Sequence, residues 1–237
     1  MAESLIESFE IKRDVVALVG AGGKTTLAFA IAEEVRRSGA KAIITTTTRL
    51  GADETGGLEV VPPDIDRIQV ALAASGSCLV IAARDERKAT GVSPQWVDTI
   101  WRAQIADVII VEADGARRRK VKAPGPHEPV VPGGATLVIA VMAARAIGGV
   151  ITEVAHRPGL VASIVAAGRS DRLTPEGAAK LLGSSRGGRK SVPPKARFAV
   201  AITGASGPQA PPARRVAELL APIRVVLVPT APSAGQV

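Results

Sequence analysis

Seven short runs rich in aliphatic residues recur along the chain, and polar residues do not alternate within them. The runs occupy residues 15–19, 41–46, 78–83, 107–112, 136–142, 198–203 and 224–228. Strands of this kind are covered on both faces, as in a parallel sheet between helices. Because only 2% of the residues are aromatic and none is tyrosine, Val, Ile, Leu and Ala must fill the core. The pattern predicts an α/β fold, with three layers around a mostly parallel sheet of about seven strands.

Helical segments are expected between these runs. Leu27, Ile31 and Val35 recur at a spacing of four residues, which predicts a helix after the first run. Ser93-Pro94 and Thr174-Pro175 have the pattern of an N-cap followed by a first-turn proline, so each pair predicts the start of a later helix.

The length of 237 residues suits one domain, so we expect residues 1–237 to form a single α/β domain. Two stretches within it look irregular. Residues 116–134 are basic, rich in Pro and Gly and too long for a simple connection, which predicts a functional loop. Residues 183–197 are polar and rich in Gly, Ser and Pro, and we expect them to be mobile. We expect residues 231–237 to be frayed.

The chain carries a formal net charge of +8, which favours an anionic partner such as a nucleotide, a nucleic acid or an anionic lipid. The scarcity of aromatic side chains argues against sequence-specific binding of nucleic acid. No apolar run approaches the roughly 18 residues of a membrane span, and the N-terminus has no apolar signal region. We therefore expect a cytoplasmic protein without membrane contact. The single cysteine, Cys78, excludes an internal disulfide and a cysteine-based metal cluster, and its apolar run predicts a buried thiol.

The first aliphatic run leads into a glycine-rich loop and then into the predicted helix. The loop residues are Gly20, Ala21, Gly22, Gly23, Lys24, Thr25 and Thr26. Glycines let backbone N–H groups approach phosphate oxygens closely, and a helix N-terminus adds the positive end of its dipole. Lys24 would reach the β- and γ-phosphates of a nucleotide, and Thr25 would bind Mg²⁺. The segment therefore predicts a P-loop.

The long form of the P-loop motif has a first glycine five residues before Gly23, where this chain has Leu18. The shorter form G-x-x-G-K-T-T is complete, and it resembles the loop of Mur-type ATP-dependent ligases. A glycine-rich turn without a ligand is the alternative, but such a turn would not need Lys24 and two threonines. We interpret Leu18 as part of a buried strand and Gly20 as the start of the phosphate cradle.

A phosphate site needs a second element, which we expect to be an acid at the end of a buried strand. Glu112 and Asp114 follow a run of aliphatic residues. Both are candidate Mg²⁺ ligands and catalytic residues, because carboxylates there would hold the metal's water shell or orient an attacking water. Glu112 to Gly115 also form an E-x-x-G pattern similar to that of metallochaperone GTPases, in which the glycine N–H would contact the γ-phosphate. The residues alone do not rank the two acids by role.

Four threonines and an arginine, Thr45 to Arg49, stand at the end of the second run. Open α/β sheets bind their ligands at the carboxyl ends of strands, so Thr48 and Arg49 are candidate nucleotide-binding residues. A run of strand-forming threonines that pack their methyl groups is the alternative. The guanine-reading N-K-x-D motif is expected after a late strand, but residues 204–207 read GASG. The sequence therefore favours ATP over GTP and does not exclude GTP.

The two histidines, His127 and His156, lie in proline-containing loops. His127-Glu128 lacks the second histidine of the metalloprotease motif. We consider His127 a candidate catalytic residue that handles a substrate, with an ordinary loop histidine as the alternative. The basic run 117–120 would either be a solvated face or neutralise a polyanionic ligand.

Taken together, these segments resemble the YqeC-type family of selenium cofactor biosynthesis proteins, which are accessory to selenium-dependent molybdenum hydroxylases. The resemblance rests on VALVGAGGKTT, TTTTRL, VEADGARRRKVKAPGPHEPVVP, HRPGLVA and LTPEGAAKLL, in that order, over roughly residues 5–203. It implies a P-loop nucleotide-binding protein, with Thr48, Glu112, Asp114 and His127-Glu128 as site positions besides the loop. Members often carry an N-K-A-D-like segment where this chain has TGASG, which leaves the base open.

The leading interpretation is a Mg²⁺-dependent, ATP-hydrolysing protein that helps to mature a selenium-dependent molybdenum hydroxylase. Lys24, Glu112 and Asp114 would act on the γ-phosphate, while the basic loop and His127 would face the hydroxylase or its cofactor. Two alternatives stay open at this point. One is a non-enzymatic module that binds a phosphorylated cofactor, and the other is a Mur-like ATP-dependent ligase.

Overall fold

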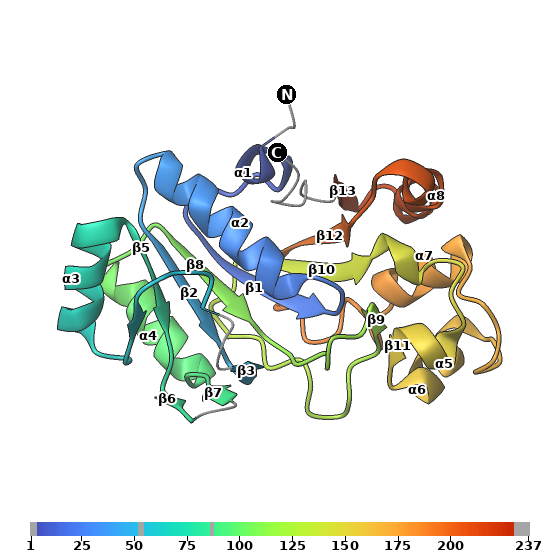
Figure 1. The fold of residues 1–237 in the computed structure, drawn as a ribbon, viewed down its shortest axis with the longest axis horizontal. Coiled ribbons are helices and arrows are strands. Elements are labelled where there is room, and N and C mark those ends of the chain that lie inside the picture. The colour runs from blue at the N-terminus through green and yellow to red at the C-terminus, as the bar shows by residue number, and fades with distance from the viewer. Residues whose placement is uncertain (1–3, 52–54, 86–87, 230–237) are drawn as a thin grey trace, which may run out of the picture.

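An eight-stranded parallel sheet forms the centre of the molecule. The computed structural model describes residues 4–51, 55–85 and 88–229, so the expectation for residues 231–237 lies outside the described residues. The strand order is β13-β12-β10-β1-β8-β2-β5-β4 (Figure 1), and every paired neighbour is parallel. The predicted α/β fold with a parallel sheet is therefore confirmed. The strand that the sequence did not predict is β4 (Val60–Val61), whose two residues are too few to form a pattern.

The other elements have the following bounds. The sheet strands are β1 Asp14–Gly20, β2 Ala42–Thr46, β5 Ser77–Val80, β8 Val108–Glu112, β10 Leu137–Ala143, β12 Arg197–Thr203 and β13 Arg224–Val228. The helices are α1 Leu5–Ser8, α2 Lys24–Arg37, α3 Ile65–Ser75, α4 Pro94–Ala103, α5 Ile151–Val154, α6 Pro158–Val165, α7 Pro175–Gly183 and α8 Ala210–Leu220, with 3-10 turns η1 Ala144–Ala146 and η2 Gly207–Gln209. Strands β3 Arg49–Gly51, β7 Lys88–Thr90 and β6 Ala83–Arg84 form a small antiparallel sheet, and β9 Val121–Lys122 pairs with β11 Ala155–His156.

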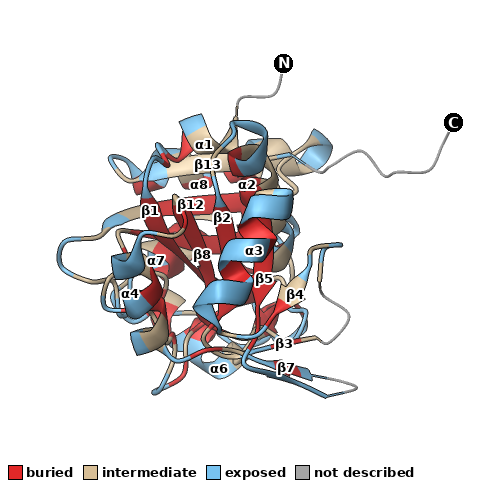
Figure 2. Ribbon diagram, turned by 90° about the vertical axis from the view of Figure 1, so that its left-hand side faces the viewer, coloured by how far each residue is buried: buried red, intermediate tan, exposed pale blue. Residues whose placement is uncertain are grey.

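The sheet is buried on both faces, as the aliphatic runs predict, and Figure 2 shows its strands as the buried centre of the molecule. Alternate residues of β1 divide between two cores. Val16 and Leu18 pack with α1 and α2, whereas Ala17 and Val19 pack with α3, α4 and the helices α5 to α8. Three layers result. Cys78 in β5 is fully buried, and burial raises the pKa of its thiol to about 12, which confirms the predicted buried thiol.

The predicted helix starts are also confirmed. The Ser93 side chain accepts a hydrogen bond from the Trp96 N–H at the start of α4, and Thr174 accepts one from the Gly177 N–H at the start of α7. Helix α2 contains the predicted spacing of apolar residues and ends before Gly39, which has a φ of +83°. Within the described residues, no helix is long and apolar enough to cross a membrane.

Both irregular stretches make defined contacts with other parts of the protein. Residues 116–134 include the short strand β9, and the segment packs against the end of β10 through a hydrogen bond from the Ala143 N–H to the Lys120 carbonyl. Residues 183–197, which we expected to be mobile, have defined contacts instead. The Gly188 N–H donates to the Leu181 carbonyl, and Lys190 Nζ donates to the Pro126 carbonyl. The second segment therefore packs against the first.

Candidate phosphate-binding site

The glycine loop lies between the end of β1 and the start of α2, at the carboxyl edge of the sheet. Gly20, Gly22 and Gly23 have φ values of +94°, +88° and +112°, a region that strongly favours glycine. A Cβ on Gly20 would lie 2.5 Å from the Val141 carbonyl oxygen, and one on Gly22 would collide with Ala143 of β10. Backbone conformation and close packing therefore both require glycine in this loop.

The backbone N–H groups of the loop fall into two sets. The Gly20 N–H donates to Asp114 Oδ2 at 3.0 Å, and the Ala21 N–H donates to the Val141 carbonyl at 3.0 Å. These two amides, which we predicted as phosphate contacts, hold the loop to neighbouring strands. The first hydrogen bond of α2 runs from the Leu27 N–H to the Gly23 carbonyl. Helix geometry leaves the N–H groups of residues 24–26 without an acceptor inside the helix, so they are the donors available for an anion.

Lys24 lies buried in the middle of the site, with a side chain that is 3% exposed. Its Nζ donates to the Gly20 carbonyl at 2.7 Å and lies 3.1 Å from Asp114 Oδ1 and 3.5 Å from Glu112 Oε1. Burial disfavours the ammonium, but the charges of Asp114 and Glu112 outweigh it and raise the pKa of Lys24 above its ordinary value. The lysine is therefore charged, and its three donors are shared among protein acceptors.

The two acids have different surroundings. Glu112 Oε2 accepts a hydrogen bond from Thr25 Oγ1 at 2.8 Å, and its side chain is 11% exposed. The Asp114 side chain is 1% exposed, and its Oδ1 accepts no hydrogen bond from any described residue apart from its ion pair with Lys24. The structure therefore brings Lys24, Thr25, Glu112 and Asp114 together, as the sequence predicts.

The same oxygens suit Mg²⁺. The Thr25 hydroxyl and the Glu112 carboxylate are hard donors that already touch, and Asp114 has an oxygen that lacks a hydrogen bond. The described residues contain no group of three or more His, Cys, Asp and Glu side chains arranged to hold a metal by themselves. One hydroxyl and one or two carboxylates are the protein donors expected where Mg²⁺ is bound together with substrate phosphates.

The threonine run is mainly structural. The Thr45 hydroxyl donates to the Val80 carbonyl, the Thr46 hydroxyl to the Glu112 carbonyl and the Thr47 hydroxyl to the Val130 carbonyl. The first two bonds connect β2 with β5 and with the end of β8, and the third connects residue 47 with residue 130. Thr48 Oγ1 lies 3.2 Å from Thr46 Oγ1, and Arg49 is exposed at the start of β3. Among the described residues, no hydrogen bond or ion pair joins Arg49 to Lys24 or to the two acids.

The candidate residues that follow Asp114 in the sequence differ in how far they are buried. The carbonyl of Gly115 accepts a hydrogen bond from Lys122 Nζ. Arg117 and Arg118 are exposed with positive φ values, and His127 is exposed at a turn. His156 is half-buried in β11, where burial and the nearby cations Arg157 and Lys122 lower its pKa.

Three residues belong to this region although the sequence did not predict them. Lys122 Nζ lies 3.1 Å from Asp114 Oδ2 and 2.6 Å from Glu128 Oε2. Arg157 donates to both Glu128 oxygens, at 2.6 and 3.0 Å, and the Thr203 hydroxyl donates to the Gly22 carbonyl. Burial alone would raise the pKa of Glu128, but the hydrogen bonds from Arg157 and Lys122 lower it to about 2. The VKAP and HRPG segments contain two of the three, but no local spacing links them to the P-loop.

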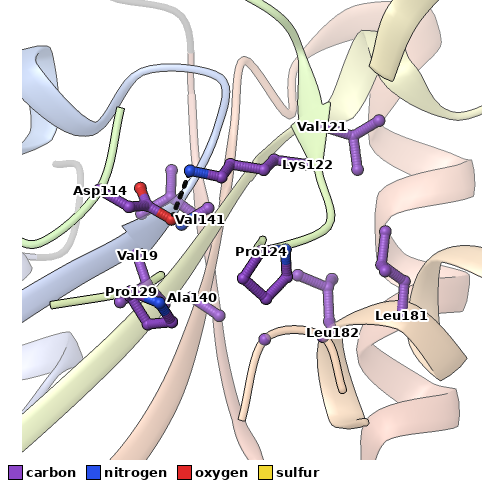
Figure 3. Close-up of a pocket in the computed structure, with 13 residues that line it drawn as sticks. Val19, Asp114, Val121, Lys122, Pro124, Pro129, Ala140, Val141, Leu181 and Leu182 are labelled. Atoms are coloured by element: carbon purple, nitrogen blue, oxygen red, sulfur yellow. Dashed lines mark hydrogen bonds and ion pairs between the residues drawn. The ribbon is translucent and has the colours of Figure 1, made fainter. Parts of the chain in front are cut away.

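A small pocket lies beside Asp114 and Lys122 (Figure 3). Val19 of β1, Ala140 and Val141 of β10, Pro124 and Pro129 line it (Figure 3). Leu181, Leu182, Gly187 and Gly188 complete the lining. The other side chains that line the pocket are mainly apolar. The Asp114–Lys122 ion pair therefore lies between the phosphate site and an apolar region.

The fold and this site define a three-layer α/β protein of the P-loop type. The model of the family described as "YqeC protein" matches residues 16–159. A protein of Escherichia coli strain K12, named only "Uncharacterized protein YqeC", is 34% identical over 182 residues, which cover 76% of this chain and 71% of that protein. This chain therefore belongs to the YqeC family.

Two solved structures show a more distant similarity. The signal recognition particle receptor FtsY from Elizabethkingia anophelis matches with a TM-score of 0.44 and 16% identity. The signal recognition particle 54 kDa protein from Aeropyrum pernix K1, solved in complex with GDP, matches with a TM-score of 0.41 and 15% identity. Each match covers 91% of this chain, but this chain spans only 56% and 42% of the respective structures.

Proposed function

We propose that this protein binds a Mg-nucleotide in the loop 20–26 and cleaves its γ-phosphate, with ATP as the favoured nucleotide. The observation that carries the proposal is the position of Lys24, a buried ammonium at the first residue of α2 beside two carboxylates. An ion pair that only stabilised the fold would not need a neighbouring loop of glycines with positive φ values and open N–H groups. The P-loop type of fold supports nucleotide binding in general terms.

The lysine and the helix N-terminus would bind the phosphates. Lys24 would exchange part of its contacts with Glu112, Asp114 and the Gly20 carbonyl for phosphate oxygens, which are stronger acceptors. The N–H groups of residues 24–26 would donate to the same anion along the axis of α2. A phosphate chain would thus lie over the loop, next to the acids.

The structure suggests different roles for the two acids. Glu112 shares the Thr25 hydroxyl, so these two side chains would hold Mg²⁺, and Glu112 would accept a proton from an attacking water. Mg²⁺ bound there would supply positive charge against the phosphate oxygens. Asp114 is tied to the Gly20 N–H and to Lys24, so it would orient the loop and the lysine.

The proposal also covers which nucleotide base is bound and which protein this chain helps to mature. Residues 203–207 follow β12, and Thr203 contacts the loop, which places the GASG segment near the phosphate site. Because this segment lacks the guanine-reading motif, we favour ATP. The resemblance described above adds a pathway, the maturation of a selenium-dependent molybdenum hydroxylase. In that pathway the exposed His127 and basic residues 117–119 would contact the hydroxylase or its cofactor.

Phosphate release from Mg-ATP and Mg-GTP by the purified protein tests the reaction. We expect slow release of phosphate that requires Mg²⁺, with ATP preferred. Binding without any release would instead support a module that holds a phosphorylated cofactor. Release that requires an added carboxylate acceptor would support a ligase. Absence of both binding and release would contradict the proposal.

A further inference from the structure

Five side chains of alternating charge extend from the P-loop to the loop that carries His127. This charge chain consists of Lys24, Asp114, Lys122, Glu128 and Arg157. Asp114 lies between two lysines, with Oδ1 3.1 Å from Lys24 Nζ and Oδ2 3.1 Å from Lys122 Nζ. Lys122 lies in turn between two acids, Asp114 and Glu128. Each inner member of the chain is therefore shared by two partners of opposite charge.

We propose that Lys122 is a positioning residue of the phosphate site, which holds Asp114 in place when Lys24 turns to a bound phosphate. We propose further that Glu128 competes with Asp114 for Lys122. The inference rests on the proposed nucleotide binding. It assigns to the chain a second lysine that acts on the site without touching the nucleotide.

The need for a second cation follows from the burial of Asp114. Its side chain is 1% exposed, and a buried carboxylate that loses its only counter-charge is strongly destabilised. Lys24 would weaken its pairing with Asp114 when it binds phosphate, because its donors are already shared among three acceptors. Lys122 and the Gly20 N–H would then be the donors that remain on Asp114 Oδ2.

Lys122 has no other evident reason to be charged. Its side chain is 0% exposed, and the strand β9 that carries it has two residues paired with β11. An apolar residue would fill such a position without the cost of burying an ammonium. Lys122 contacts Asp114, Glu128 and the carbonyl of Gly115, all of which lie on the acidic segment or the His127 loop.

Competition between Asp114 and Glu128 for Lys122 can be tested with two substitutions. Lys122 Nζ lies closer to Glu128 Oε2, at 2.6 Å, than to Asp114 Oδ2, at 3.1 Å. Removing Lys122 would leave Asp114 short of positive charge as Lys24 departs. Removing the charge of Glu128 would instead release Lys122 toward Asp114. Only the removal of Lys122 should therefore weaken nucleotide binding, whereas a general loss of structure would weaken it in both variants.

Calorimetric titration of the full chain with Mg-ATP makes this comparison. We expect Lys122→Met to weaken binding about tenfold or more, within the usual range of coupling between sites. We expect Glu128→Gln to bind as tightly as the unmodified protein, or more tightly. The matched control is Arg197→Gln, which breaks the Asp14–Arg197 ion pair at the opposite edge of the sheet and should leave the affinity unchanged.

The two histidines of the chain provide a second measurement that does not depend on the folding of Lys122→Met. His127 adjoins Glu128 in sequence, and His156 is the strand partner of Lys122. With ¹³C-labelled histidine, we expect Mg-ATP to shift the His156 signal in the unmodified protein and to shift it less in Glu128→Gln.

Two results would overturn the proposal while leaving nucleotide binding intact. One is a loss of affinity in Glu128→Gln as large as in Lys122→Met, since that would indicate direct contact or general damage. The other is tight binding of Mg-ATP to the unmodified protein with no change in the His156 signal. A complete absence of Mg-ATP binding would contradict the proposed function itself, and the proposal for Lys122 with it.

Discussion

Strand β1 has a buried acid near each of its ends, and the two acids are bound in different ways. At the amino end, Asp14 accepts hydrogen bonds from Thr136, from the Lys12 N–H and, through both oxygens, from Arg197. At the carboxyl end, Asp114 pairs with Lys24 through an oxygen that accepts no hydrogen bond among the described residues. A fully satisfied ion pair stabilises a fold, whereas an incompletely satisfied one beside an open helix N-terminus can exchange partners. We therefore interpret the first pair as structural and the second as functional.

The largest expected effect is at the carboxyl end. Lys24→Ala should weaken Mg-ATP binding by about 30- to 140-fold, because a charge-assisted contact contributes roughly 2–3 kcal/mol. The folded state should survive, since Lys122 still pairs with Asp114. Calorimetry measures the affinity, and thermal unfolding serves as the control. Unchanged affinity would contradict the functional interpretation of the Lys24–Asp114 pair.

Glu112→Gln separates binding from reaction. The amide keeps the size of the side chain, a contact with Thr25 and a carbonyl oxygen that can still face Mg²⁺, so we expect nucleotide affinity within a few-fold of the unmodified protein. Phosphate release should fall by about 10²–10⁴-fold, the usual contribution of a general base. A loss of affinity that appears only in the presence of Mg²⁺ would show that Glu112 acts chiefly as a metal ligand.

The glycine loop allows a test of stability at the same edge. Gly22→Ala should lower the free energy of unfolding by about 2–4 kcal/mol, because a Cβ at its positive φ would also meet Ala143 of β10. The matched control is Gly39→Ala, which has a similar φ of +83° but nothing within 4 Å of the added atom. The control should cost about 1 kcal/mol. Equal losses in chemical denaturation would show that close packing does not constrain the loop.

The smallest effect is expected at the amino end. Arg197→Gln should lower the free energy of unfolding by about 1–2 kcal/mol at pH 7, since the Arg197 side chain is partly exposed. Burial acts to raise the pKa of Asp14, but its hydrogen bonds, together with Arg197, leave it lowered. Because the pKa of Asp14 is lower in the folded state, the stabilisation by this ion pair is complete above the unfolded-state pKa of about 3.9. It is lost as the pH falls through the folded-state pKa.

Denaturation of both proteins as a function of pH checks this sign. The difference between the unmodified protein and Arg197→Gln should be constant near neutral pH and shrink below about pH 4. A difference that grows on acidification would contradict the interpretation of Asp14 as an ionised, structural partner.

The sequence predicts what is local and misses what is assembled in space. Continuous aliphatic runs mark seven of the eight sheet strands, and side-chain caps at Ser93 and Thr174 mark two helix starts. Lys24, Thr25, Glu112 and Asp114 are predictable because each stands at a strand end or a helix start. Lys122 is not predictable in this way, because its role depends on the pairing of two short strands that are far apart in sequence.

The threonine run is the opposite case, because its sequence suggests a ligand and the structure gives most of its hydroxyls protein partners. Four consecutive hydroxyls suggest a ligand site, yet Thr45, Thr46 and Thr47 donate to backbone carbonyls of neighbouring segments. Composition cannot distinguish a hydroxyl that binds a ligand from one that satisfies a buried carbonyl. The carbonyls of β5, β8 and residue 130 give these three hydroxyls protein partners, whereas a nucleotide contact by Thr48 or Arg49 stays a prediction.

The most direct test of a nucleotide site around Lys24 is thermal unfolding of the unmodified protein with Mg²⁺ and either ATP or GTP. A ligand at 100 times its dissociation constant adds about 2.7 kcal/mol of stability. For a chain of this size, that corresponds to a rise of roughly 5–10 °C in Tm. We predict such a rise with Mg-ATP and its loss in Lys24→Ala. No rise with either nucleotide at millimolar concentration would contradict the account.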